Sequence, residues 1–135
     1  MPILGIDWGE KRIGLAISRN GIAFDFRTLN FDDFDQVVKK IKKICEDEKV
    51  ERIIFGISKN KEGQIGFQAK KQINFAEKLK NKLNLEIIFE NEILTSKEAE
   101  RYLKEQHINQ NRISDLIDQK AAQMILQAYL DRNKK

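Results

Sequence analysis

Three extended apolar runs follow one another within the first thirty residues of this chain: 3–8, 12–18 and 22–30. Only a few residues around Gly9 and around Asn20-Gly21 separate them. Connections this short join neighbouring strands in antiparallel fashion, because a parallel pair needs a crossover of a dozen or more residues. The chain is therefore predicted to begin with a three-stranded antiparallel meander.

Helical and extended patterns alternate after this meander. Apolar residues recur at helical spacing from Phe34 to Cys45, and Asp32 and Asp33 precede them, where carboxylates favour a helix N-terminus. Nearly continuous apolar runs at 53–57 and 85–89 predict strands that are covered on both faces.

Three further helices are expected. The first places Ile73, Ala76, Leu79 and Leu83 on one side, after a polar loop with two glycines. The second opens at a capping-box pattern, residues 95–98, and the last begins near Ser114 after a polar break and ends near Arg132. A meander followed by strand–helix–strand units predicts an α/β fold with a mixed five-stranded sheet flanked by helices.

Length, charge and cysteine content narrow the class of protein. A chain of 135 residues is expected to form one domain, 1–135. Cys45 is the only cysteine, no signal sequence is visible, and no apolar run approaches the length of a membrane span, which together predict a cytoplasmic protein without a membrane partner. The net charge of +4 permits an anionic partner such as nucleic acid. Monomer and homodimer are both left open.

Acidic residues recur where elements leave the predicted core. Asp7 ends the first strand and is followed by Gly9, so a ligand could approach the backbone closely there. Asp118 shares a helix face with Ala122, Ile125 and Tyr129, so its carboxylate is expected to point toward the protein. Glu90 and Glu92 end another strand, and their side chains are expected on one face because strand residues two apart point to the same side.

Four segments together resemble one family. The segment from Gly5 to Ala16 looks like the opening motif of the YqgF/RuvX family, which is named for Holliday junction resolution and whose members are viewed as nucleases that mature the small-subunit ribosomal RNA precursor. Later segments are similar to its other motifs, in the right order: Phe55-Gly56-Ile57 with Gly63 and Gln68-Ala69, Glu92-Ile93-Leu94-Thr95-Ser96 with Ala99, and Asp118 with Ala121-Ala122 and Leu126.

The resemblance implies an RNase H-like fold in which Asp7, Glu92 and Asp118 gather as catalytic residues and metal ligands. Three carboxylates in one pocket repel one another, and hard cations such as Mg²⁺ or Mn²⁺ relieve that repulsion. Two such ions can clamp a scissile phosphate. The implied function is metal-dependent hydrolysis of phosphodiester bonds, in 5′-end maturation of pre-16S ribosomal RNA or on branched DNA.

Basic residues near these motifs are predicted to bind the substrate. Lys11 and Arg12 adjoin Asp7 in sequence, and Arg12 suits a bidentate phosphate contact. Lys59 and Lys61 belong to the predicted polar loop. Structured RNA and branched DNA both remain candidate substrates.

The chain also departs from the family pattern. Asn91 and Ile93 stand where the family usually has Asp and Arg around Glu92, and Ser58 stands at a position that favours Pro. Glu90 is an additional or replacement ligand in this interpretation. The departures leave a catalytically weakened RNA-binding assembly factor as an alternative. The Asp-x-Gly turn also resembles a phosphate loop of the actin and sugar-kinase class, whose two domains 135 residues cannot supply.

Overall fold

The computed structural model describes residues 1–58, 66–91, 101, 104–105 and 110–133, with the backbone alone for 110–115. Its strands and helices follow in this order: β1 (Ile3–Trp8), β2 (Arg12–Arg19), β3 (Ile22–Asn30), α1 (Phe34–Asp47), β4 (Arg52–Ile57), α2 (Phe67–Leu83), β5 (Glu86–Asn91) and α4 (Gln110–Arg132). The five strands form one mixed sheet in the order β3-β2-β1-β4-β5. β1, β2 and β3 pair antiparallel, whereas β4 and β5 run parallel to β1. The predicted fold class is thus confirmed.

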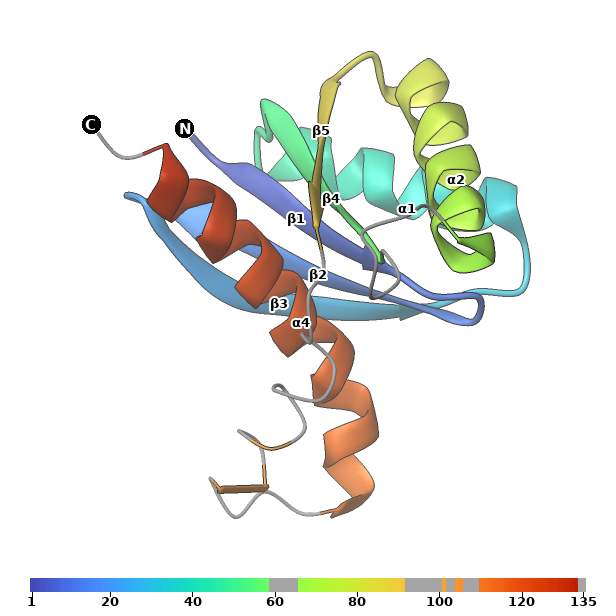
Figure 1. Ribbon diagram of the computed structural model, residues 1–135. Coiled ribbons are helices and arrows are strands. Elements are labelled where there is room, and N and C mark those ends of the chain that lie inside the picture. Colours follow the sequence, from blue (N-terminus) through green and yellow to red (C-terminus); the bar gives the residue numbers. More distant parts are fainter. Residues whose placement is uncertain (59–65, 92–100, 102–103, 106–109, 134–135) are drawn as a thin grey trace.

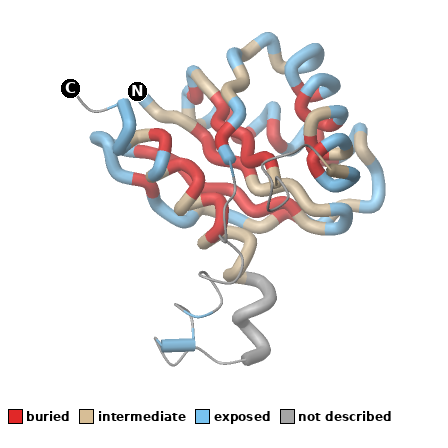
Figure 2. Tube along the Cα trace, in the orientation of Figure 1, coloured by how far each residue is buried: buried red, intermediate tan, exposed pale blue. Residues whose placement is uncertain are grey.

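Helices cover both faces of this sheet (Figure 1). α1 and α2 lie on one face, and α4 crosses the other. Side chains alternate across each strand, so β1 contributes Leu4 and Ile6 to the cluster under α1 and α2, and Ile3 to the cluster under α4. Figure 2 shows the buried residues concentrated in the strands and in the helix faces against them. Two hydrophobic layers therefore hold the sheet between the helices.

The second half of α4 is fastened to the sheet, whereas its first turns extend past the sheet (Figure 1). Gln127 Oε1 accepts the Ala23 N–H at 2.9 Å, and Gln123 Nε2 donates to the Ala23 carbonyl at 3.0 Å. The Tyr129 hydroxyl accepts a hydrogen bond from Arg52 at the start of β4. These bonds connect α4 to β3 and β4, on either side of β1 and β2 in the sheet. No helix in the described part of the chain is apolar over enough length to cross a membrane.

Two sequence-based expectations differ from the structure. The 85–89 run forms an edge strand that is only partly covered, because Ile87 and Ile88 are half-buried, one against each hydrophobic cluster, and Phe89 is 43% exposed. The last helix begins at Gln110, so part of the polar segment predicted as a break is helical. The helix predicted from residue 95 lies outside the described residues.

Cys45 is buried on the inner face of α1, as its helical spacing predicted. Burial, with a smaller effect of Glu46, raises the pKa of its thiol to about 11. At pH 8 the native thiolate fraction is then roughly a hundredfold below that of an exposed cysteine. We expect the native protein to react with a thiol-specific disulfide reagent at least that much more slowly than the protein unfolded in guanidinium. Native reactivity within a few-fold of the unfolded rate would contradict this burial.

Candidate active site

Asp7 lies at the end of β1, and its side chain is on the α4 face of the sheet. The alternation of β1 establishes this side: Ile6 and Trp8 pack in the cluster under α1 and α2. Two residues before Asp7, a Cβ on Gly5 would lie 2.9 Å from the Leu126 Cβ of α4. Residues two apart in a strand share a face, so the half-buried carboxylate of Asp7 is directed to the α4 side.

Gly14 is the common neighbour of Asp7 and Asp118. Asp7 pairs with Gly14 across the β1–β2 ladder, so both residues face α4. The backbone of Asp118 rests directly on Gly14, because a Cβ there would overlap the Asp118 carbonyl group and lie 2.8 Å from its Cβ. The structure therefore brings together two predicted site residues from opposite ends of the chain. The absence of a side chain at residue 14 makes this approach possible.

Arg12 is the cation beside this pair. Its Nε lies 3.1 Å from Oδ2 of Asp118, whose side chain is 20% exposed against 40% for Arg12. A half-buried carboxylate is stabilised by such a partner. The predicted phosphate-binding arginine is thus located at the site, where it contacts an acidic residue.

Lys11 and Glu10 form the exposed turn after β1. The ammonium group of Lys71, on α2, donates a hydrogen bond to Glu10, and this bond lowers the pKa of the Glu10 carboxyl. The same ammonium group lies 4.4 Å from the ring centroid of Phe67, which is 75% exposed. The two contacts of Lys71 thus link the turn after β1 to the N-terminal part of α2.

Glu90 faces α4 as well, but its carboxylate has a different partner. Glu90 pairs with Gly56 of β4, and the β1–β4 register places Gly56 level with Asp7. Its side chain is 6% exposed and accepts a hydrogen bond from Arg132. Arg132 lies about 21 Å beyond Asp118 along α4. The Glu90 carboxylate therefore contacts the C-terminal end of α4 and does not lie beside Asp118.

Glu92, Lys59 and Lys61 lie outside the described residues. Within the described ranges, no three His, Cys, Asp or Glu side chains converge in a group that could hold a metal ion. Asp7 and Asp118 accordingly supply two acidic positions, and the predicted third ligand comes from a segment that the structure does not describe.

Gln72 is a site neighbour that sequence reasoning missed. Its side chain is 1% exposed and hydrogen-bonds the backbone of Trp8 and of Ser58. The signal was present in the sequence, because Gln72 occupies the buried stripe of α2 with Ala69, Phe75, Ala76 and Leu79. A polar residue at such a position needs hydrogen-bond partners inside the protein. Ile73, predicted for that stripe, is only partly buried.

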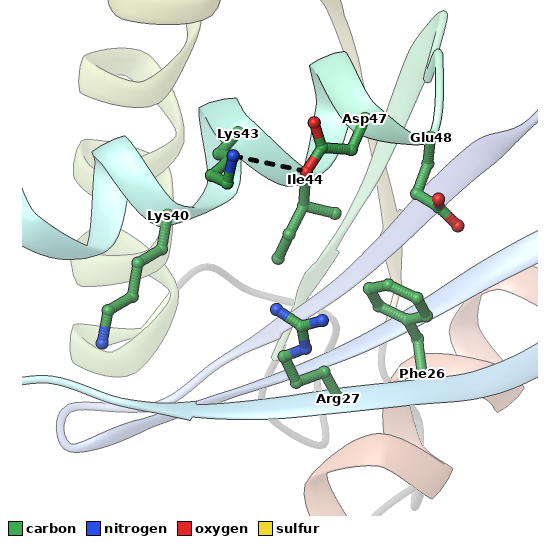
Figure 3. Close-up of a pocket in the computed structure, with 7 residues that line it drawn as sticks. All are labelled: Phe26, Arg27, Lys40, Lys43, Ile44, Asp47 and Glu48. Carbon is green, nitrogen blue, oxygen red and sulfur yellow. Dashed lines mark ion pairs between the residues drawn. The ribbon is translucent and has the colours of Figure 1, made fainter.

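A hollow of about 240 Å³ lies between α1 and β3 (Figure 3). Phe26 and Arg27 line it from the strand, whereas Lys43 and Asp47 form an ion pair at 3.7 Å on the helix. α1 covers the sheet face opposite to α4 (Figure 1). This hollow is therefore separate from the Asp7–Asp118 site.

The fold is that of RNase H-like resolvases. Over 98% of this chain and 94% of the other, it is similar to RuvC of Thermus thermophilus, solved in complex with a Holliday junction substrate, with a TM-score of 0.61 and 10% sequence identity. It is also similar over the full length of both chains to the Fowlpox virus resolvase, solved with Holliday junction DNA, with a TM-score of 0.64 and 15% identity. At these identities the likeness shows the fold.

The sequence comparisons identify the family. A family model described as "RuvX: Holliday junction resolvase" matches residues 1–132. A protein of Caldanaerobacter subterraneus subsp. tengcongensis named "Putative pre-16S rRNA nuclease" is 40% identical over 99% of both chains. A protein of Clostridium acetobutylicum with the same name is 37% identical over 97% of this chain and 98% of its own. The chain belongs to the RuvX family.

Proposed function

We propose that this chain is a nuclease that hydrolyses phosphodiester bonds with Mg²⁺ or Mn²⁺, in the 5′-end maturation of pre-16S ribosomal RNA. The observation that carries the proposal is the meeting of Asp7 and Asp118 across Gly14. Residues 111 positions apart converge where β1 leaves the core. The names of the full-length relatives support the nuclease activity and the RNA substrate.

The donor set fits a hard divalent cation. Asp7 and Asp118 offer carboxylate oxygens, which Mg²⁺ and Mn²⁺ prefer. In the proposed site these two residues and Glu92 hold the ions. Divalent ions held in this way supply Lewis-acid stabilisation of the scissile phosphate and a water of lowered pKa.

The basic residues bind and orient the substrate in this proposal. Arg12, already 3.1 Å from Asp118, is placed to donate to a phosphate oxygen beside the carboxylates. Lys11 is exposed on the adjacent turn and contributes a second positive charge. Lys59 and Lys61 extend this set in the proposal.

Metal binding can be measured through Trp8, the only tryptophan of the chain and the neighbour of Asp7. We expect Mn²⁺ to quench the fluorescence of Trp8 in a saturable manner and Mg²⁺ to compete. Asp118→Asn should weaken this binding by at least about tenfold, because it removes a ligand charge. Asp33→Asn is the matched control, since Asn also caps a helix N-terminus and Asp33 caps α1. Equal Mn²⁺ affinity in Asp118→Asn and wild type would contradict the site.

The substrate is tested by direct comparison. Purified protein with Mn²⁺ is given a pre-16S RNA fragment that carries its 5′ extension and, separately, a four-way DNA junction. Cleavage of the RNA that a chelator abolishes supports the proposal. Junction cleavage with intact RNA would favour the second candidate, a resolvase acting on branched DNA, which the description of the family model supports. Metal-independent RNA binding without any cleavage would favour the weakened assembly factor and overturn the proposed activity.

A further inference from the structure

Gln72 joins two strand ends that lie beyond the last backbone pair of the β1–β4 ladder. Its Oε1 accepts the Ser58 N–H at 2.8 Å. Its Nε2 donates to the Trp8 carbonyl oxygen at 3.4 Å and to the Ser58 hydroxyl at 3.3 Å. One side chain of α2 thus connects the residue that follows Asp7 to the residue that follows β4. We call this set of contacts, made by Trp8, Ser58 and Gln72, the amide clamp.

The amide clamp lies where the β1–β4 ladder stops. Backbone pairing between these strands runs from Ile3 with Arg52 to Ile6 with Phe55. Beyond that point β1 continues to Trp8 in its pairing with β2, and β4 continues to Ile57 in its pairing with β5. The two strands therefore end without a shared rung, and Gln72 spans the gap. A side chain of α2 therefore adds to the sheet in setting the separation of the two ends.

Packing alone does not account for Gln72. The other buried residues of its helix stripe are apolar, and Leu79 two turns later is fully buried. An apolar side chain of similar size would fill the same volume without the desolvation of an amide. Such an amide is tolerated when its partners are satisfied, and a satisfied polar group specifies one arrangement of the segments it joins.

We propose that Gln72 is a positioning residue for the active site. By holding the Trp8 carbonyl against Ser58, it sets the end of β1 and so the placement of the Asp7 carboxylate relative to Asp118. This inference rests on the proposed metal-dependent hydrolysis. A displacement of about 1 Å at such a site can reduce a rate by about a hundredfold, even when the altered residue does not touch the substrate.

The first test replaces Gln72 by methionine, which keeps the volume and removes the amide. We expect the kcat of RNA cleavage to fall between about tenfold and a hundredfold, with the KM for RNA within about threefold because the phosphate-binding cations are untouched. The Mn²⁺ concentration that half-quenches Trp8 should rise several-fold. The Ser58 amide hydrogen, followed by NMR, should exchange at least tenfold faster.

Leu79→Ala provides the matched control on the same helix. Leu79 is as buried as Gln72 but lies away from the strand ends. We expect this variant to lose more thermal stability than Gln72→Met and yet to keep the wild-type kcat and Mn²⁺ dependence when assayed well below its melting temperature. A Gln72→Met kcat within twofold of wild type would overturn the positioning role.

A double-variant cycle tests the clamp itself. Ser58→Pro removes the backbone N–H that donates to Gln72 Oε1. Gln72→Met should therefore lower kcat little further in the Ser58→Pro background. Full additivity of the two kcat losses would overturn the inference. If Gln72→Met does not fold, Ser58→Ala, which removes the hydroxyl that accepts from Gln72 and keeps the backbone N–H, should still raise the Mn²⁺ requirement, and an unchanged requirement would count against the clamp. Wild type that neither binds Mn²⁺ nor cleaves would instead overturn the proposed function.

Discussion

Asp7→Asn is expected to lower the rate of metal-dependent RNA cleavage by about a thousandfold or more, which corresponds to roughly 4 kcal/mol of lost transition-state stabilisation. The substitution keeps the size of the side chain and removes the charge that would hold a divalent ion beside Asp118. RNA binding should stay within a few-fold of wild type, because Lys11 and Arg12 are unaffected. Initial rates at saturating Mn²⁺, with affinity measured separately, give both quantities.

Glu10→Gln is the control for this variant. Glu10 lies on the exposed turn three residues after Asp7 and forms an ion pair with Lys71 of α2, whereas Asp118 pairs with Arg12. Glu10→Gln removes the same charge only three residues from Asp7, so the rate should stay within a few-fold of wild type. Full activity of Asp7→Asn, or an equal loss in both variants, would reject the assignment of Asp7 as the ligand.

Gly14→Ala is expected to have the largest effect on folding. The added methyl group would overlap the backbone of Asp118, which cannot rotate aside as a side chain can. α4 must then move off the sheet, although Gln123, Gln127 and Tyr129 hold it in place. Overpacking against backbone of this kind costs about 3 kcal/mol or more. Urea denaturation followed by circular dichroism measures the loss in the free energy of unfolding.

Gly66→Ala is the matched glycine substitution. A Cβ at Gly66, the N-cap residue of α2, would meet nothing within 4 Å among the described residues. Because Gly is a better N-cap residue than Ala, we expect a loss of no more than about 1 kcal/mol, well below that of Gly14→Ala. If Gly14→Ala unfolds at the same urea concentration as Gly66→Ala, then α4 does not rest on β2 as described.

The strands of the meander were predicted almost to the residue because their limits follow from local chemistry. Gly9 and Asn20-Gly21 break the apolar runs, and Asn20 and Gly21 adopt the positive φ angles that the β2–β3 turn requires. The start of α1 was equally visible, since Asp33 accepts the Asp35 N–H. Each of these signals acts within a few residues and is therefore legible in one sequence.

The errors arose where distant contacts decide the structure. The apolar run of β5 does not reveal that β5 is the last strand in the order of the described sheet, so its exposure depends on sheet order. Gln110 to Arg112 are polar and nevertheless helical. Gln and Arg have high intrinsic helix propensity, and this part of α4 extends past the sheet.

The site divides in the same way. The position of Asp7 at a strand end and the inward direction of Asp118 on α4 could be predicted from local residue patterns. Their meeting depends on Gly14, whose lack of a side chain matters only once α4 is placed over β2. The role of Gln72 depends on where the β1–β4 ladder stops, which no local pattern records.

The order of the elements has a consequence for synthesis on the ribosome. β1 to β5 and the helices of one face are translated before α4, so the emerging chain can pack α1 and α2 while the opposite face of the sheet still lacks its cover. Asp7 meets Asp118 only after the segment bearing Asp118 has left the exit tunnel. A protein proposed to cut ribosomal RNA would in this way stay inert until α4 has been translated and has packed on the sheet.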